Sequence, residues 1–343
     1  MLQGLKQYLT TWAGDDKSRV DVADTINRIT IGAVQLAKEI ALPTLDGSES
    51  SVIGENTDGD AQKVLDVRAD EMFMDAMKGG AIRLYGSEEA ELPVEINKDA
   101  PLALAIDPLD GSSNIETNGT VGTIFSILPI GKISAESTFG QAGDAQLAAG
   151  FVAYGPRTQM FLTLGQGTLL LQLDFEHSDF VIINDNVQIE KYTSEFAINV
   201  SNYRHWDDGI RTYIDDCFDG EEGARERNFN MRWLASLVAD ATRIFARGGV
   251  FLYPGDIRPT YKEGRLRLVY EAFPLAFLVE QAGGCASTGT VRILDLIPRQ
   301  LHERIPLIFG SKDEIEHIEK IIANPSSSKG KSPLFGNQGL FRR

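Results

Sequence analysis

The first clear pattern along the chain is a helical repeat of apolar residues in residues 20–42. Offsets of three and four place these side chains on one face, so the repeat predicts an amphipathic helix that Pro43 ends. The residues on this face are Val22, Ile26, Ile29, Ala33, Leu36 and Ile40. The same periodicity returns in residues 62–77 and predicts a second helix. The stretch between them, SVIGENTDGDAQ, is polar and glycine-rich and predicts a mobile loop.

Short apolar runs predict strands in the following part of the chain. Residues 102–106 are continuously apolar, which is typical of a strand covered on both faces. The other predicted strands cover residues 81–85, 122–130, 148–173, 196–200, 250–253 and 266–270. Further helices are predicted over residues 207–218, 232–247 and 274–282.

The balance of strands and helices changes near residue 200, which predicts a boundary between residues 1–200 and 201–325. The 343 residues suit two domains or one large α/β unit. Residues 326–343 are rich in serine and glycine and are predicted to form a peripheral tail.

The charge of the chain excludes some classes of partner. Acidic residues outnumber basic ones by 49 to 33, which gives a net charge of −16. Binding to nucleic acid or to an anionic membrane needs a basic surface, so neither is expected. A phosphorylated substrate stays compatible with this charge, because a metal ion and a few arginines can reverse the field in one cleft.

The two cysteines, Cys217 and Cys285, are far apart and form no C-x-x-C motif. They indicate neither a disulfide framework nor a zinc site, and they favour a reducing cytoplasmic location. We expect no signal peptide, because the first residues lack a long apolar segment. We also expect no membrane span, because no segment approaches 18 uninterrupted apolar residues.

The stretch APLALAIDPLDGSSNIE suggests chemistry at the end of a buried strand. We expect Pro108 to stop the strand and the turn to bring Asp110 back beside Asp107. Two such carboxylates repel each other unless a cation lies between them, and Mg²⁺ prefers oxygen ligands. The following Gly-Ser-Ser-Asn exposes N–H groups and hydroxyls, which suits a phosphate at a helix N-terminus. An Asp-Pro turn followed by a helix cap is the alternative, but the apolar run and the Gly-Ser-Ser favour metal-assisted phosphoryl chemistry.

Other acids follow predicted strands. Glu88 and Glu89 lie just beyond residues 81–85, and Glu271 ends the run LRLVYE. Asp66 interrupts an otherwise apolar stretch, KVLDV. Taken singly, each acid could be a solvated surface group. Their recurrence at strand ends favours a shared site, because ligands of α/β sheets gather at the carboxyl ends of strands.

Together these motifs resemble class I fructose-1,6-bisphosphatase. The segments GDAQKVLDV, SEE, DPLDGSSNIE, GGVFLYP, GRLRLVYE, FLVEQAGG and ILDLIPRQLHERIPLIFGS carry the resemblance over about residues 20–320. DPLDGSS is shared with the inositol monophosphatase-like superfamily, whereas its combination with LYP, RLxYE and EQAGG is specific to the bisphosphatase.

The resemblance implies a layered α/β/α/β/α sugar-phosphatase fold with mixed sheets, an N-terminal metal- and phosphate-binding domain and a C-terminal sugar-binding domain. It implies Mg²⁺-dependent hydrolysis of the 1-phosphate of fructose 1,6-bisphosphate to fructose 6-phosphate and phosphate, in gluconeogenesis or the Calvin cycle. Two or three Mg²⁺ ions per site are implied, with Mn²⁺ as a substitute. It also implies a homotetramer.

The resemblance assigns roles to residues of this sequence. The implied metal ligands are Glu88, Asp107, the Leu109 carbonyl oxygen, Asp110 and Glu271. The implied water-activating acids are Asp66 and Glu89. The reacting phosphate would be held by Asp110, Gly111, Ser112 and Ser113.

The far end of the sugar would be bound by Asn199 and Tyr253, with Arg232 reaching into a neighbouring subunit's site. Trp233 stands where the family has a tyrosine, and Arg265 where it has a lysine. Both changes keep stacking area and charge, but an arginine is a planar fork and a lysine a point charge. Arg267 is expected to be a solvated surface residue on its strand.

Three alternatives stay open at this point. The substrate could be sedoheptulose 1,7-bisphosphate, alone or beside the six-carbon sugar. A non-catalytic sugar-phosphate sensor is disfavoured because the acids are intact, and an inositol monophosphatase is disfavoured by the C-terminal motifs. Inhibition by AMP is not expected, because ALPTLDGSES and Pro101-Leu102 stand where the family's AMP motifs would be.

Overall fold

The structure is a computed structural model that describes residues 3–42, 52–55, 61–131 and 136–324. Its main sheet has eight strands in the order β10-β9-β8-β7-β6-β5-β3-β4. β3 and β5 pair in parallel, and the other neighbours pair antiparallel. The strands are β3 (Ile82–Ser87), β4 (Val94–Glu95), β5 (Leu102–Asp110), β6 (Val121–Pro129), β7 (Ala148–Tyr154), β8 (Thr158–Thr163), β9 (Thr168–Asp174) and β10 (Asp179–Asn184).

A second sheet of five strands follows in the order β12-β11-β13-β17-β15. Its strands are β11 (Glu195–Ala197), β12 (Asn230–Met231), β13 (Val250–Tyr253), β15 (Cys285–Ser287) and β17 (Leu307–Gly310). Two small antiparallel pairs complete the strands: β1 (Val52–Glu55) with β2 (Ala61–Lys63), and β14 (Leu266–Arg267) with β16 (Arg304–Ile305).

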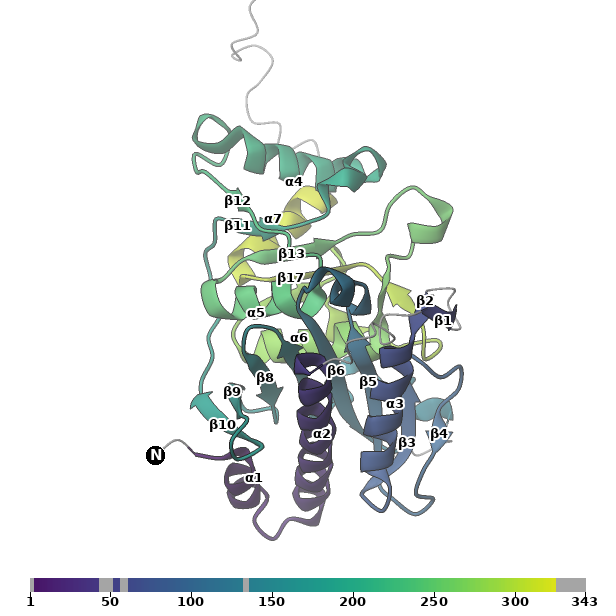
Figure 1. Cartoon of the computed structure of the whole chain (residues 1–343). Helices are drawn as coiled ribbons and strands as arrows, with labels where there is room; N and C mark the ends of the chain where they lie inside the picture. The colour runs from purple at the N-terminus through teal and green to yellow at the C-terminus, as the bar shows by residue number, and fades with distance from the viewer. Residues whose placement is uncertain (1–2, 43–51, 56–60, 132–135, 325–343) are drawn as a thin grey trace, which may run out of the picture.

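The helices form three layers around the two sheets (Figure 1). One apolar core joins the main sheet to α1 (Leu5–Ala13), α2 (Lys17–Ala41) and α3 (Val64–Met77). A second core joins both sheets to α5 (Leu237–Arg247) and α6 (Phe273–Gln281). A third joins the five-stranded sheet to α4 (Asp208–Asp219) and α7 (Lys312–Ala323). The layers are therefore α/β/α/β/α, which confirms the predicted fold class.

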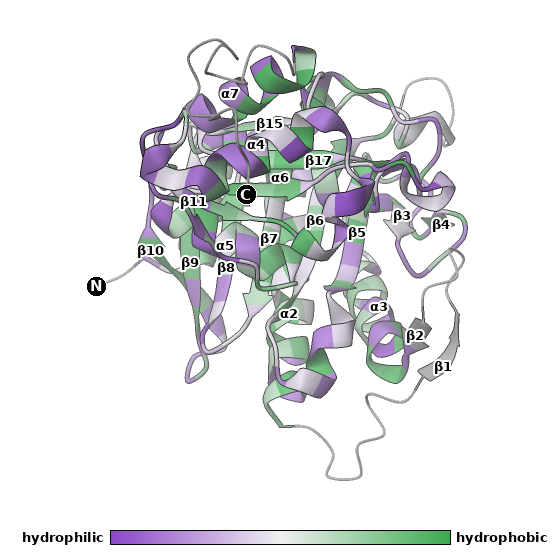
Figure 2. Cartoon of the chain, turned by 90° about the horizontal axis from the view of Figure 1, so that it is seen from above, coloured by the Kyte–Doolittle hydropathy of each residue, from purple (hydrophilic) through white to green (hydrophobic). Residues whose placement is uncertain are grey.

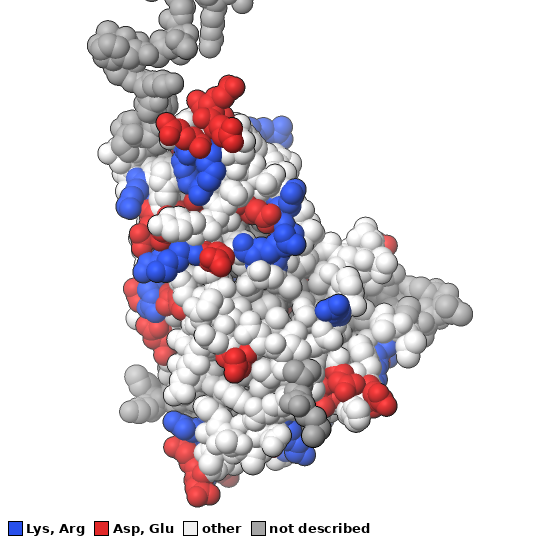
Figure 3. Space-filling view, turned by 90° about the vertical axis from the view of Figure 1, so that its left-hand side faces the viewer, with Lys and Arg blue, Asp and Glu red and all other residues white. Residues whose placement is uncertain are grey.

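The hydropathy of the helices matches their layers. Figure 2 shows α6 almost entirely green, as expected for a helix buried between two sheets, whereas α7 carries purple and green sides. None of the helices in the described part of the chain combines the length and apolar character that crossing a bilayer requires. On the face in Figure 3, Lys and Arg are interspersed with Asp and Glu.

β5 is buried over its whole length, and its two faces differ in size. Leu104 and Ile106 pack into the core under α2 and α3. Ala103 and Ala105 face the other side and pack with Val269 and Tyr270. The small alanines let the segment 268–272 approach the strand closely, and this approach brings residues 107 and 271 together.

Several predictions about elements were wrong at their ends. β5 continues through Pro108 to Asp110, with an irregular register opposite β6 between Asp107 and Asp110. The strand predicted over 266–270 ends at Arg267, and residues 268–272 form a π-helical turn, η8, that leads into α6. Glu271 therefore lies in this turn and does not end a strand.

The helix predicted over 232–247 begins only at Leu237, because Ala235 has a φ of 59° and Ser236 then caps the helix. The predicted loop over 51–62 contains the short strands β1 and β2, and its residues 56–60 lie outside the described residues. The predicted tail, residues 326–343, also lies outside the described residues.

Candidate active site

Three acids from two distant parts of the sequence meet beside β5. Asp107, Asp110 and Glu271 each offer a carboxylate oxygen, and these oxygens lie within 4.8 Å of one another. All three side chains are buried, with 2%, 8% and 7% of their surfaces exposed. Buried acids this close to each other are costly without a cation, so the cluster has the chemistry of a metal site.

The main chain around the cluster orients each carboxylate. Asp107 Oδ1 accepts a hydrogen bond from the Leu109 N–H at 3.0 Å, which forms the corner between the two aspartates. Asp110 Oδ2 accepts from the Val238 N–H at 3.3 Å, in the first turn of α5. Glu271 accepts from the Arg267 N–H. The corner, the start of α5 and η8 thus hold the three acids in fixed positions.

Glu88 belongs to the same cluster electrostatically, although the three-acid group within 4.8 Å does not include it. Its N–H donates to the Ile106 carbonyl at 3.1 Å, which places the turn after β3 beside the end of β5. Burial is the main cause that raises the pKa of Asp107, and the charge of Glu88 is the next. Glu88 also raises the pKa values of Asp110 and Glu271.

The raised pKa values of the three acids indicate a site with excess negative charge. Burial raises the pKa of Asp110 to about 7, against the opposing effect of the Val238 N–H. Burial and the charges of Glu88 and Asp110 raise the pKa of Glu271 well above its ordinary value. Four carboxylates and main-chain carbonyls are the oxygen ligands that hard divalent cations prefer, so the residues present fit a divalent metal.

A buried acid that the sequence analysis missed supports the turn after β3. Asp70 Oδ1 accepts hydrogen bonds from Tyr85 Oη at 2.8 Å and from Ser87 Oγ at 2.6 Å. Ser87 Oγ in turn accepts from the Glu89 N–H at 3.2 Å. Asp70 lies four residues after Asp66, so the i, i+4 spacing on one helix face was the available signal.

A histidine joins the same turn to η8 from the other side. His302 Nε2 is 3.1 Å from the Ala90 carbonyl oxygen, and His302 Nδ1 is 2.9 Å from Tyr270 Oη. A carbonyl oxygen can only accept, so Nε2 carries a proton, and in the neutral imidazole Nδ1 accepts from Tyr270 Oη. His302 therefore connects the segment of Glu88 and Glu89 to the segment of Glu271. The sequence analysis missed it.

The predicted phosphate loop follows the corner directly. Gly111 has a φ of 75°, a conformation that favours glycine, and the short 3₁₀ helix η2 (Ser112–Thr117) begins after it. Asn114 Nδ2 donates to the Ala235 carbonyl at 2.9 Å and ties the loop to the start of α5. Ser113 is exposed. The loop presents its first residues next to Asp110.

Asp66 lies at the start of α3, against this loop. Its Oδ2 accepts from the Lys63 N–H at 2.7 Å, and Lys63 Nζ donates to the Ser112 carbonyl at 3.3 Å. Burial raises the pKa of Asp66, whereas the Lys63 N–H and the Ser112 hydroxyl lower it. The structure thus brings Asp66 to the phosphate loop.

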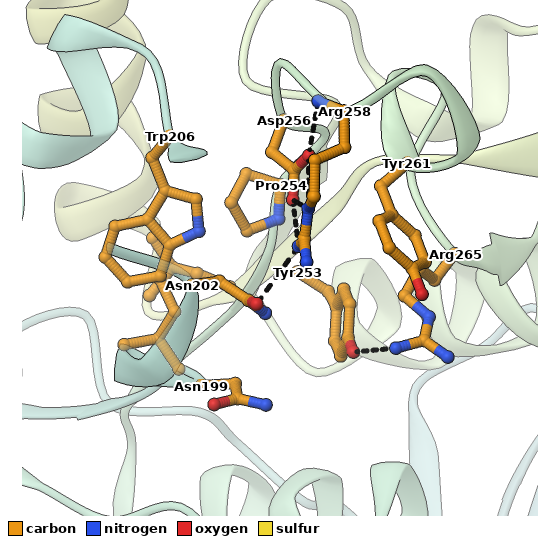
Figure 4. A pocket seen from close by; sticks show the side chains of 11 residues that line it. Asn199, Asn202, Trp206, Tyr253, Pro254, Asp256, Arg258, Tyr261 and Arg265 are labelled. Carbon is orange, nitrogen blue, oxygen red and sulfur yellow. Dashed lines mark hydrogen bonds and ion pairs between the residues drawn. The ribbon is translucent and has the colours of Figure 1, made fainter. Parts of the chain in front are cut away.

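A second pocket lies at the end of β13 (Figure 4). Asn199, Tyr253 and Arg265 line it, and Arg265 Nη1 is 3.5 Å from Tyr253 Oη. The sequence analysis missed other polar lining residues in this pocket, which are Asn202, Asp256, Arg258 and Tyr261. The concentration of Arg and Tyr in the segment GDIRPTYKEGR was the available signal.

The remaining predicted residues lie outside this pocket. Trp233 packs beside Tyr253, with ring centroids 6.0 Å apart. Arg232 is half-exposed, and its Nε is 4.0 Å from a Glu195 oxygen. The sequence analysis expected Arg267 to be a solvated surface residue, and this prediction is wrong. Arg267 is 3% exposed, and its charge lowers the pKa of Glu271.

Comparisons with known proteins agree over the whole chain. The family model for the N-terminal domain of fructose-1-6-bisphosphatase matches residues 15–185, and the model for its C-terminal domain matches residues 189–323. The chain is 50% identical to fructose-1,6-bisphosphatase class 1 of Sinorhizobium medicae, covering 98% of both chains. It is 48% identical to that of Rhodopseudomonas palustris strain BisB18, covering 100% of both.

A solved structure is similar as well. The crystal structure of Leishmania major fructose-1,6-bisphosphatase in holo form matches with a TM-score of 0.87 at 29% sequence identity. The match covers 94% of this chain and 100% of that one.

Proposed function

The chain belongs to the fructose-1,6-bisphosphatase family, and we propose that it hydrolyses the 1-phosphate of fructose 1,6-bisphosphate to fructose 6-phosphate and inorganic phosphate. The relatives' shared name makes the chain an enzyme, a phosphoric monoester hydrolase. The observation that carries the proposal is the meeting of Asp107, Asp110 and Glu271 within 4.8 Å.

The residues that would hold the metal come from three segments. They are Glu88, Asp107, the Leu109 carbonyl, Asp110 and Glu271. Mg²⁺ is the proposed ion, at two or three per site, with Mn²⁺ as a substitute. The ions would neutralise charge on the phosphoryl group and polarise it for attack. The raised pKa values of the three central acids support this assignment, since a bound cation relieves their mutual repulsion.

The protein's own groups would orient the reaction. The N–H groups of Gly111, Ser112 and Ser113 hold the reacting phosphate, next to Asp110. Asp66 or Glu89 acts as the general base that takes the proton from the attacking water. The raised pKa of Asp66 brings its basicity closer to neutrality, which favours this role. Attack opposite the sugar oxygen then releases the sugar without a covalent enzyme intermediate.

The pocket of Figure 4 would receive the other end of the sugar. Asn199, Tyr253 and Arg265 line it, and Trp233 would contribute stacking area beside Tyr253. We propose a cytoplasmic homotetramer, active in gluconeogenesis or the Calvin cycle, in which Arg232 reaches a neighbouring subunit's site. Its half-exposed position outside its own chain's pocket supports a role at an interface.

Phosphate release tests the proposal. The purified protein is assayed with fructose 1,6-bisphosphate and sedoheptulose 1,7-bisphosphate, each with Mg²⁺, with chelator, and with AMP. We expect Mg²⁺-dependent release from the six-carbon substrate that AMP does not inhibit. No release from either sugar in the presence of Mg²⁺ would contradict the proposed activity. A strong preference for the seven-carbon sugar would replace the substrate and keep the chemistry.

A further inference from the structure

We propose that Asp240 is a positioning residue for the proposed reaction: it holds the turn at residues 234–236 in a strained conformation that fixes the phosphate loop and the start of α5. This inference rests on the proposed function and deepens it. The sequence analysis did not select Asp240, and the proposed mechanism gives it no role.

Asp240 is a buried acid outside the metal cluster. It is 1% exposed and lies in the first turn of α5. Its Oδ1 and Oδ2 are 3.2 Å and 3.3 Å from the Leu234 nitrogen, and the Ala235 N–H also donates to the carboxylate. Arg243 directs its guanidinium to Glu195, at 2.8 Å and 2.9 Å. Among the described residues, the hydrogen bonds found for the Asp240 carboxylate therefore come from the main chain of the 234–236 turn.

The 234–236 turn is strained at its central residue. Ala235 has a φ of 59°, in the left-handed region that a residue with a Cβ populates about 5- to 30-fold less readily than glycine. Such a conformation persists only where the surrounding structure imposes it. The N–H groups of Leu234 and Ala235 point to one buried carboxylate, which supplies this constraint. The conformation of the turn therefore depends on Asp240.

The turn anchors the phosphate loop from one side. The Ala235 carbonyl accepts from Asn114 Nδ2 at 2.9 Å, and Asn114 lies in η2. A Cβ built on Gly111 would lie 3.7 Å from Ser236 Oγ, so the start of the loop and the turn are in contact. Because the direction of a carbonyl group follows the backbone angles of its residue, relaxation at Ala235 would remove the anchor of the loop.

The turn also sets the start of α5. Ser236 Oγ accepts from the Ala239 N–H at 3.3 Å and caps the helix, and the Val238 N–H donates to Asp110 at 3.3 Å. The 234–236 turn leads directly into this cap, so its conformation determines where the Val238 N–H points. Asp240 therefore acts on the phosphate loop and on Asp110 through the turn.

The test combines two substitutions in one cycle. The full-length wild type, Asp240→Ala, Ala235→Gly and the double variant are assayed for phosphate release from fructose 1,6-bisphosphate in Mg²⁺. Asp240→Ala removes the charged acceptor and should lower kcat/KM about 10- to 100-fold. Glycine adopts the left-handed conformation without strain, so Ala235→Gly should raise kcat/KM about fivefold or more in the Asp240→Ala background. The gain should be smaller in the wild type, where Asp240 already holds the turn.

Ser178→Gly is the matched control for the recovery. Ser178 is exposed and has a φ of 51° in the turn between β9 and β10, so glycine relieves the same kind of strain there. Added to Asp240→Ala, Ser178→Gly should recover no activity. Equal recovery by Ser178→Gly and Ala235→Gly, or no recovery by Ala235→Gly, would show that Asp240 only supports the fold, and either result overturns the inference.

The Tm of each variant is measured in parallel. A lower Tm of Asp240→Ala with unchanged kcat/KM also overturns the inference, because it would show a role in stability alone. If Asp240→Ala does not fold, Asp240→Asn takes its place. Asparagine keeps one acceptor, so kcat/KM should fall several-fold and Ala235→Gly should recover part of the loss. No loss in this variant, or no recovery, overturns the inference.

Calorimetric titration with inorganic phosphate in Mg²⁺ separates this inference from the proposed function. Asp240→Ala should bind phosphate about 10-fold or more weakly than the wild type, and Ala235→Gly should restore part of the affinity, whether or not the protein hydrolyses the bisphosphate. If the wild type hydrolyses no bisphosphate yet the affinities follow this pattern, the proposed function fails and the inference stands. If the wild type is active and the affinities are equal, the inference alone fails.

Discussion

Replacing Asp110 by asparagine should destroy activity and stabilise the metal-free protein at the same time. Asp110 is 8% exposed and shares a site with Asp107 and Glu271. Asparagine keeps the shape and can still accept from the Val238 N–H, but it carries no charge. The two effects have different causes: activity needs the carboxylate as a metal ligand, whereas the metal-free fold is destabilised by it.

The magnitude of the stabilisation follows from the pKa of Asp110. Burial raises this pKa from 3.8 to about 7 in the folded protein. A raised pKa means that the folded state binds the proton more tightly than the unfolded state. The associated stability is complete below pH 3.8 and is lost as the pH rises through about 7. The loss is about 4 kcal/mol at most, at about 1.4 kcal/mol for each tenfold change in proton affinity.

The assay is thermal unfolding in chelator at pH 8 and pH 5, together with phosphate release in Mg²⁺. Asp110→Asn should have a Tm several degrees above that of the wild type at pH 8, and the difference should shrink at pH 5. Its kcat should fall by about 100-fold or more, because removing a metal ligand costs several kcal/mol of transition-state stabilisation.

Asp15→Asn is the matched control, since Asp15 is exposed, and neither its Tm nor its kcat should change appreciably. A lower Tm for Asp110→Asn in chelator, or near-normal turnover in Mg²⁺, would refute the reasoning about this cluster.

Three further predictions concern the surroundings of the site. Asp66→Asn should lower kcat by about 10²- to 10⁴-fold, because the general base is lost. The Mn²⁺ affinity measured by EPR should change little. A large loss of this affinity would instead make Asp66 a metal ligand. His302→Phe should weaken Mn²⁺ binding and lower kcat, because both hydrogen bonds of the imidazole are lost. His302→Gln can still donate and accept, so it should retain part of the Mn²⁺ affinity and part of kcat. Equal losses in the two variants would contradict a positioning role. Gly122→Ala should lower the Tm by several degrees, because the new Cβ would clash with the Val152 carbonyl oxygen of β7. Gly140→Ala, whose Cβ would make ordinary contacts of 3.5 Å, should be tolerated; similar Tm values for the two variants would show that β7 can move away.

Local patterns predicted much of the architecture. The apolar repeat of residues 20–42 lies in α2, and the apolar run 102–106 forms the first part of β5. These predictions succeeded because periodicity and burial on both faces leave direct traces in neighbouring residues. That Asp107 and Asp110 lie close together was also predictable, because only two residues separate them in the sequence. The extension of β5 through Pro108 was not predictable from the sequence, since it depends on the irregular pairing with β6.

The sites required the arrangement of distant segments. Glu271 reaches the corner because Ala103 and Ala105 let η8 pack closely on β5, and the sequence around residue 271 holds no record of that packing. Arg267 looked like an outward strand residue, yet the turn that follows it buries it beside Glu271. Arg258 lines the pocket at the end of β13 because the fold places it beside Asp256, Asn202 and Tyr261.

The order of residues alone therefore determined most of the secondary elements, though not their ends, as well as the family and the acids suited to a metal, since these depend on side-chain type and short-range spacing. The distances among those acids, the burial that raises their pKa values and the second cationic pocket were decided by how the layers stack. Electrostatic and packing energies depend on separation in space, and separation along the chain does not determine that distance.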